Sequence, residues 1–240
     1  MRILKTAGAL WLAAGLAFIT WQWNTYRAHG IDNSVFQNSD SVTVTDNSGL
    51  ITFSPSVAPT KTLIFFPGAL VAPEAYAPLM RKIAEAGYEA VLVKMPFRMA
   101  QYGYDRPEVI RLFADPEMKY CLAGHSKGAA MAASFVAQNT AQIDALVLIG
   151  TTHPRDFDLS GITIPVAKIY GTEDGVAQTA KVMENKKLLP SQTKFTPIKG
   201  GNHSQFAYYG NQIGDNPASI SRTTQQELTL AALLQTLKEM

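Results

Sequence analysis

The pattern of apolar and polar positions predicts strands that alternate with helices from residue 42 onward. Two β-rich runs at residues 42–45 and 50–53 flank a polar turn and predict an antiparallel hairpin. Continuous apolar runs predict buried strands at residues 62–66, 90–93, 120–123, 145–149, 166–170 and 194–198. Helical periodicity occurs near residues 76–83, 107–114, 127–138 and 177–188 and at the carboxyl terminus. This order predicts the α/β class, with a mainly parallel sheet and helices on both of its faces.

Two local patterns add detail to this architecture. Thr224 and Glu227 have the spacing of a capping box and predict the start of the last helix. The connection at residues 150–165 contains Pro154 and Gly161 and shows no helical apolar stripe. We therefore expect no cap domain above the carboxyl ends of the strands.

The first thirty residues differ from the rest of the chain. Arg2 and Lys5 precede an uncharged run at residues 6–23, which as a helix would span about 27 Å, and aromatic residues cluster at its far end. This pattern predicts a membrane anchor with the α/β domain on the extracytoplasmic side. A cleaved signal peptide, which would leave a secreted protein, and a buried core helix are the alternatives. The predicted anchor or signal segment spans residues 1–30, the polar tether spans 31–41, and the α/β domain spans 42–240.

Composition and charge exclude several classes of function. The 240 residues carry a formal net charge of +2 without a basic run, so nucleic acid is not an expected partner. The single cysteine, Cys121, lies in a predicted strand, which rules out a disulfide framework and a cysteine-based metal site. Neither a zinc motif nor a phosphate-binding loop occurs, so no metal ion and no cofactor is predicted. The sequence leaves the oligomeric state open.

A nucleophilic serine is predicted between the strand at residues 120–123 and the helix at residues 127–138. Residues 124–128 read Gly-His-Ser-Lys-Gly, a G-x-S-x-G motif centred on Ser126. A sharp strand-to-helix turn needs glycines on both sides, because the strained backbone of the nucleophile leaves no room for neighbouring Cβ atoms. The bare motif is common by chance, but its position at a strand-to-helix turn makes Ser126 a specific candidate nucleophile.

Four motifs together resemble the α/β-hydrolase superfamily, from about residue 42 to the end of the chain. They are Phe-Pro-Gly-Ala at residues 66–69, the Ser126 motif, Gly-Thr-Glu-Asp at residues 171–174 and Gly-Gly-Asn-His at residues 200–203. More narrowly, Lys127 and the stretches at residues 201–206, 209–210 and 214–215 resemble a small bacterial subgroup labelled fold-5, which is related to dienelactone hydrolases. The resemblance implies an uncapped α/β-hydrolase fold and a hydrolase, and leaves the substrate open.

The chain order of serine, acid and histidine is that of this fold, and it identifies a base and an acid. A serine hydroxyl needs an imidazole to accept its proton, and among four histidines His203 follows the last predicted strand after a flexible pair of glycines. The acid that orients the imidazole is expected after the strand at residues 166–170, where Asp174 stands. Glu173 is adjacent and is the alternative acid.

Two backbone N–H groups are expected to form the oxyanion hole, those of Ala69 and Lys127. The side chain of Lys127 has two interpretations, a solvated surface lysine or an attractor for an anionic substrate. Phe97, His153 and Phe206 lie in or near loops and are possible pocket residues.

The sequence therefore predicts a serine hydrolase that cleaves a carboxylic ester or a related acyl bond of a small molecule through an acyl-enzyme on Ser126. An acyltransferase that uses the same acyl-enzyme is one alternative. A catalytically silent, membrane-anchored module that only binds a partner is the other.

Overall fold

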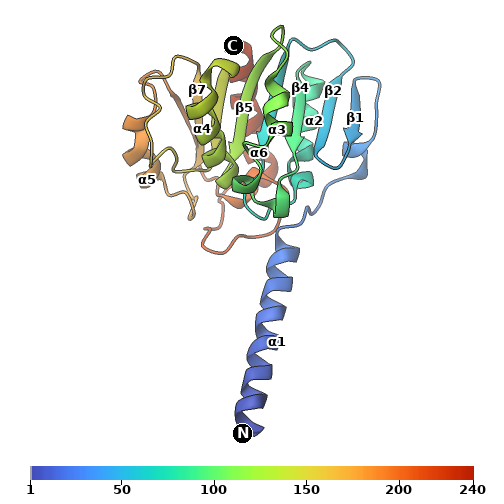
Figure 1. Ribbon diagram of the computed structural model, residues 1–240, viewed down its shortest axis with the longest axis vertical. Helices are drawn as coiled ribbons and strands as arrows, with labels where there is room; N and C mark the ends of the chain where they lie inside the picture. The colour runs from blue at the N-terminus through green and yellow to red at the C-terminus, as the bar shows by residue number, and fades with distance from the viewer. Residues whose placement is uncertain (1) are drawn as a thin grey trace.

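Eight strands form one mixed sheet in the computed structural model, which describes the backbone of residues 2–240 and the side chains from residue 6 onward (Figure 1). The order is β1-β2-β4-β3-β5-β6-β7-β8. The strands are β1 (Val42–Asp46), β2 (Leu50–Pro55), β3 (Lys61–Phe66), β4 (Glu89–Val93), β5 (Lys119–His125), β6 (Ala145–Ile149), β7 (Val166–Gly171) and β8 (Lys194–Ile198). β2 pairs antiparallel with β1 and β4, and the other pairs are parallel. The predicted sheet with its antiparallel edge hairpin is confirmed.

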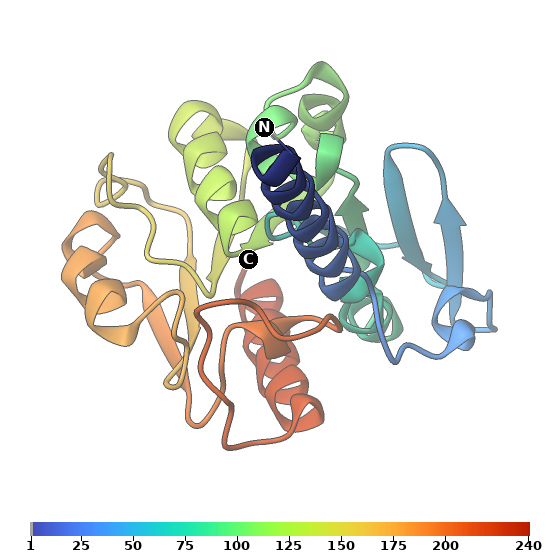
Figure 2. The same ribbon diagram turned by 90° about the horizontal axis from the view of Figure 1, so that it is seen from below.

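Helices cover both faces of the sheet, which can be seen in Figure 2, where the molecule is viewed from below. The α-helices are α1 (Arg2–Thr25), α2 (Ala77–Glu85), α3 (Pro107–Ile110), α4 (Lys127–Asn139), α5 (Thr179–Glu184) and α6 (Arg222–Glu239). Short 3-10 turns lie at Asn33–Phe36, Pro73–Tyr76, Pro96–Arg98, Ala100–Tyr102, Arg111–Phe113, Thr140–Gln142, Asn185–Leu188 and Ser204–Phe206. α2 and α6 pack on one face, and α3 and α4 on the other. No separate cap domain is present among residues 2–240, which confirms the expectation for the connection after β6.

The alternation of side chains along each strand builds the two halves of the core. In β3, Leu63 and Phe65 join the cluster under α2 and α6, whereas Ile64 and Phe66 join the cluster under α3 and α4. Neighbouring residues of a strand point to opposite faces, so a strand that is covered on both sides must be apolar throughout. The carboxyl ends of the parallel strands meet at one edge of the sheet, which is where α/β proteins place their binding sites.

The predicted capping box at the start of the last helix is wrong by one turn. Ser221 is the N-cap of α6, and its hydroxyl accepts a hydrogen bond from the N–H of Thr224 at 3.1 Å. A serine hydroxyl in this position satisfies one of the unpaired N–H groups at a helix start. The helix therefore begins before Thr224, and Thr224 lies inside its first turn.

The membrane anchor predicted at residues 6–23 is also wrong. No helix in the described part of the chain is both long and apolar enough to cross a membrane. Polar and small residues within the run, such as Gln22, lower its mean hydropathy. The prediction that the catalytic domain is anchored outside the cytoplasm therefore loses its basis, and the side chains of Arg2 and Lys5 on which it drew lie outside the described residues. Signal cleavage stays a prediction.

The predicted segment does form a helix, α1, which projects from the domain (Figure 1). The alternative of a buried core helix fails as well, because Trp11 is 80% exposed and Leu10 is 67% exposed. The base of α1 is held against the domain near the carboxyl edge of the sheet. Tyr26 stacks on Tyr209 with ring centroids 5.6 Å apart, and its carbonyl accepts the N–H of Ala72 at 2.8 Å. These contacts cross the predicted domain boundary at residue 30.

Candidate active site

Ser126 lies at the turn between β5 and α4 in a backbone conformation that few residues with a side chain adopt. Its φ and ψ are 53° and −118°, and its N–H donates to the carbonyl of Ile149 at 2.9 Å. Such strain persists only where the surrounding structure imposes it. A Cβ on Gly128 would lie 2.0 Å from the Phe66 carbonyl oxygen, and one on Gly124 would lie 2.6 Å from the Gly128 backbone. The two glycines of the motif are therefore required by close backbone approach.

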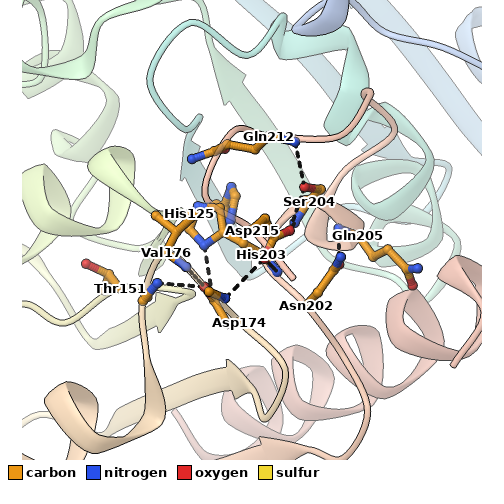
Figure 3. A network of polar contacts seen from close by, with 12 residues as sticks. His125, Thr151, Asp174, Val176, Asn202, His203, Ser204, Gln205, Gln212 and Asp215 are labelled. Atoms are coloured by element: carbon orange, nitrogen blue, oxygen red, sulfur yellow. Dashed lines mark hydrogen bonds and ion pairs between the residues drawn. The ribbon is translucent and has the colours of Figure 1, made fainter. Parts of the chain in front are cut away.

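His203 and Asp174 form a buried pair in the loops that follow β8 and β7. His203 Nδ1 and Asp174 Oδ2 are 2.9 Å apart, and neither side chain is exposed (Figure 3). The other carboxylate oxygen accepts the N–H groups of Val176 at 2.8 Å and Ala177 at 2.6 Å. With both of its oxygens engaged, Asp174 can hold the imidazole in one orientation and leave Nε2 available.

The chain order places Ser126, Asp174 and His203 after the carboxyl ends of β5, β7 and β8, at the same edge of the sheet. Within residues 2–240, His203 Nε2 is buried without a hydrogen-bond partner, and no hydrogen bond joins it to the Ser126 hydroxyl. Catalytic hydrogen bonds are often long without substrate and tighten in the substrate complex. Nε2 is thus without a partner in this state.

A cavity of about 200 Å³ opens beside Ser126. It is lined by Ser126, Lys127, Ala130, Gly150, Thr151, Thr152, His153, Arg155, Val176 and Ala177. The predicted pocket residue His153 and the predicted oxyanion-hole residue Lys127 therefore belong to it. The other two predicted pocket residues do not line it, because Phe97 is 81% exposed and Phe206 is buried against the ring of His125.

The backbone N–H groups of Ala69 and Lys127 have no acceptor in the part of the chain that the structure describes. The N–H groups on either side of Ala69 are engaged. Gly68 donates to the Tyr76 hydroxyl at 3.0 Å, and Leu70, with φ at 64°, donates to the Arg98 carbonyl at 2.7 Å. This arrangement fixes the loop after β3 and leaves Ala69 as its free donor. Lys127 is the first residue of α4, where N–H groups have no partner within the helix.

A buried tyrosine, Tyr76, and a buried histidine, His125, hold the loop after β3 in place. The sequence patterns assign no such role to either residue. The Tyr76 hydroxyl accepts the Gly68 N–H and also forms a hydrogen bond with His125 Nδ1, 2.8 Å away. The ring of His125 lies 4.5 Å from that of His203, measured between centroids. Burial lowers the pKa of His125 well below its usual value, and the neighbouring His203 lowers it further. His125 therefore stays neutral beside His203.

Basic side chains near the cavity affect the pKa of His153. Burial lowers the pKa of His153 to about 4, and the Arg155 guanidinium contributes to the decrease, with smaller effects of Lys127 and Lys168. Lys168 is completely buried on β7, its Nζ donates to the carbonyl of His153, and burial lowers its pKa to about 7. His153 is thus a neutral side chain in the wall of the cavity at neutral pH.

Lys168 should give the folding stability a pH dependence. The unfolded chain keeps a proton on this amine up to its ordinary pKa of 10.5, whereas the folded protein loses the proton above about 7. The unfolded state binds more protons in this window, so the free energy of unfolding should rise with pH relative to that of Lys168→Met, by roughly 1 kcal/mol or more. Urea denaturation at several pH values between these limits measures the difference. The exposed Lys119→Met is the control, and a constant difference for Lys168→Met would contradict the burial effect.

Comparison with known proteins identifies the family. The chain belongs to the alpha/beta hydrolase family, whose model matches residues 62–227, more than half of its length. No curated protein matches the chain in sequence. The predicted resemblance is thereby confirmed at the level of the family and of the uncapped fold.

Solved structures show the same fold at low sequence identity. A serine hydrolase without lid from Xanthomonas campestris is 16% identical, with a TM-score of 0.59 over 84% of this chain and 96% of that one. Esterase 2 of Thermogutta terrifontis is 16% identical, with a TM-score of 0.57 over 85% and 97%. A putative dienelactone hydrolase from Klebsiella pneumoniae is 17% identical, with a TM-score of 0.53 over 78% and 92%. At these identities the likeness extends to the fold alone.

Proposed function

We propose that this chain is a serine hydrolase that cleaves a carboxylic ester or a related acyl bond of a small molecule. The observation that carries the proposal is the buried hydrogen bond of 2.9 Å between His203 Nδ1 and Asp174 Oδ2. A carboxylate in this position favours the tautomer with its proton on Nδ1 and stabilises the imidazolium that forms when Nε2 accepts a proton. The strained turn at Ser126 supports the same assignment.

Each group has one task in the proposed reaction. His203 Nε2 accepts the hydroxyl proton of Ser126 while Oγ attacks the acyl carbon, and the carbonyl oxygen becomes an oxyanion. The N–H groups of Ala69 and Lys127 donate to this oxyanion. The leaving alcohol takes the proton from His203, and the acyl group remains on Ser126 as an ester. Water then attacks this ester while His203 accepts its proton; the bond to Oγ breaks, the carboxylic acid leaves, and His203 returns the proton to Ser126.

A fluorophosphonate probe tests the nucleophile without knowledge of the substrate. The probe should label the wild-type protein and the exposed control Ser160→Ala, and it should fail to label Ser126→Ala. Labelling of Ser126→Ala to the wild-type extent would reject the proposal. Product analysis with an added alcohol then separates hydrolysis from the alternative of acyl transfer, since only acyl transfer yields a new ester.

Short acyl groups are the expected substrates. The cavity beside Ser126 measures about 200 Å³, and no cap formed by residues 2–240 encloses it. A longer chain would bury few additional methylene groups, each of which contributes about 0.8 kcal/mol when buried. We expect kcat/KM for p-nitrophenyl esters from acetate to palmitate to be highest at about two to four acyl carbons. A maximum at about eight carbons or more would contradict this prediction and indicate an extended groove.

A further inference from the structure

One carboxylate, that of Asp215, joins the loop that carries the base to the loop that carries the acid (Figure 3). Its Oδ1 accepts the backbone N–H of His203 at 3.1 Å and that of Gly175, next to Asp174, at 3.2 Å. Its Oδ2 accepts the N–H and the hydroxyl of Ser204 at 2.8 and 2.6 Å. Four donors from two loops therefore converge on a side chain from a third loop.

The three loops also meet through their backbones. A Cβ on Gly175 would lie 2.4 Å from the Gly214 carbonyl oxygen and 2.9 Å from the N–H nitrogen of Asn216. The Asn202 side chain donates to the Asn216 carbonyl at 2.7 Å, which ties the loop of the base to the same segment. A small shift of the segment around Asp215 would therefore move the backbone beside both His203 and Asp174.

A turn-forming role within its own loop does not account for the contacts of Asp215. Within that loop Oδ1 accepts the adjacent Asn216 N–H at 3.0 Å, and the Asp215 N–H donates to the Gln212 carbonyl at 3.1 Å. The bonds to His203, Gly175 and Ser204 all leave the loop. An ionised carboxylate offers only acceptors and forms hydrogen bonds about twice as strong as neutral ones. An amide would turn an NH₂ donor toward donors that need an acceptor.

We propose that Asp215 is a positioning residue of the active site, which holds the loops of His203 and Asp174 in the relative placement that their hydrogen bond requires. It acts through backbone N–H groups and touches no reacting atom. The proposal rests on the proposed function, because the placement matters for catalysis only if His203 is the base.

Asp215→Asn tests the proposal with two readouts. We expect kcat for a short ester to fall by about 10- to 100-fold with KM within about twofold of wild type, because a misplaced base slows the chemical step more than it weakens binding. In the proton NMR spectrum, the low-field signal of the His203 Nδ1 proton should shift or disappear. The matched control is Asp158→Asn, since the Asp158 carboxylate accepts hydrogen bonds from the nearby Ser160, including its N–H at 2.7 Å, in an exposed loop.

A purely structural role would lower the melting temperature of Asp215→Asn while the folded protein kept the wild-type kcat and the wild-type low-field signal, and this result would overturn the proposal. If Asp215→Asn does not fold, Ser204→Ala tests the proposal in its place. This variant removes the Ser204 hydroxyl, one of the four donors to Asp215 from the other two loops. We expect kcat to fall by about two- to fivefold with a shifted low-field signal. An unchanged kcat and an unchanged signal would overturn the proposal. The NMR readout needs no activity, so it still reports on the pair if the wild-type protein fails the fluorophosphonate test.

Discussion

Replacing Ser126 or His203 with alanine should lower kcat/KM for a short ester by about a thousandfold or more. Ser126→Ala removes the attacking oxygen, and His203→Ala removes the group that accepts its proton, so either change disables the same step. Residues that act as one unit lose nearly all of their effect when one is removed, and the double variant should be little worse than either single one. Steady-state kinetics of the three variants measures this.

The two variants should differ in stability, because Ser126 is partly exposed and His203 is completely buried. Ser126→Ala should stay within about 1 kcal/mol of the wild-type free energy of unfolding. His203→Ala leaves the Asp174 carboxylate without its buried partner and should cost about 1–3 kcal/mol. The exposed His29→Ala is the control for histidine removal. A His203→Ala protein that keeps most of its activity would exclude this residue as the base.

Gly128→Ala should damage both folding and activity, although it adds a single methyl group. The added Cβ would lie 2.0 Å from the Phe66 carbonyl oxygen and 2.4 Å from that of Pro67, so the end of β3 or the start of α4 must move. We expect a loss of about 3 kcal/mol or more in the free energy of unfolding. Where the protein still folds, we expect kcat/KM to fall by about 100-fold, because the same shift moves the free N–H groups of Ala69 and Lys127.

Gly161→Ala is the matched control for Gly128→Ala. Apart from its chain neighbours, no described residue has an atom within 4 Å of a Cβ built on Gly161, which is in the loop between β6 and β7. Its stability and activity should therefore remain close to those of the wild type. Equal effects of the two substitutions in urea denaturation would mean that the close approach at Gly128 does not limit the fold.

The sequence alone was sufficient for the fold because the relevant signals are local. A strand covered on both faces must be apolar throughout, so β3 and β6 stand out as continuous runs. A tight turn between strand and helix admits no Cβ on its flanks, so Gly124 and Gly128 mark the position of Ser126. The family match then confirmed the class. The roles of Ser126, Asp174 and His203 stay predictions until they are tested.

Local signals were insufficient where neighbouring turns offered equivalent choices. Ser221 and Thr224 can both cap a helix, and the structure places the cap at Ser221.

The run at residues 6–23 is uncharged, but absence of charge does not by itself make a helix apolar enough to cross a membrane. The positions of Phe97 and Phe206 could not be inferred either, because whether a loop side chain faces a cavity depends on the path of the backbone.

Tertiary structure alone decided how the site is supported. Tyr76 fits the apolar stripe of a helix, and nothing near it in the sequence indicates that its hydroxyl accepts the Gly68 N–H and faces His125. Asp215 is 40 residues from Gly175 along the chain, yet its carboxylate accepts that residue's N–H. Such hydrogen bonds require donor and acceptor within about 3 Å and in line, a condition set by where separate loops meet. Sequence therefore determined the elements and the order of the candidate residues, whereas the fold determined which distant side chains hold them in place.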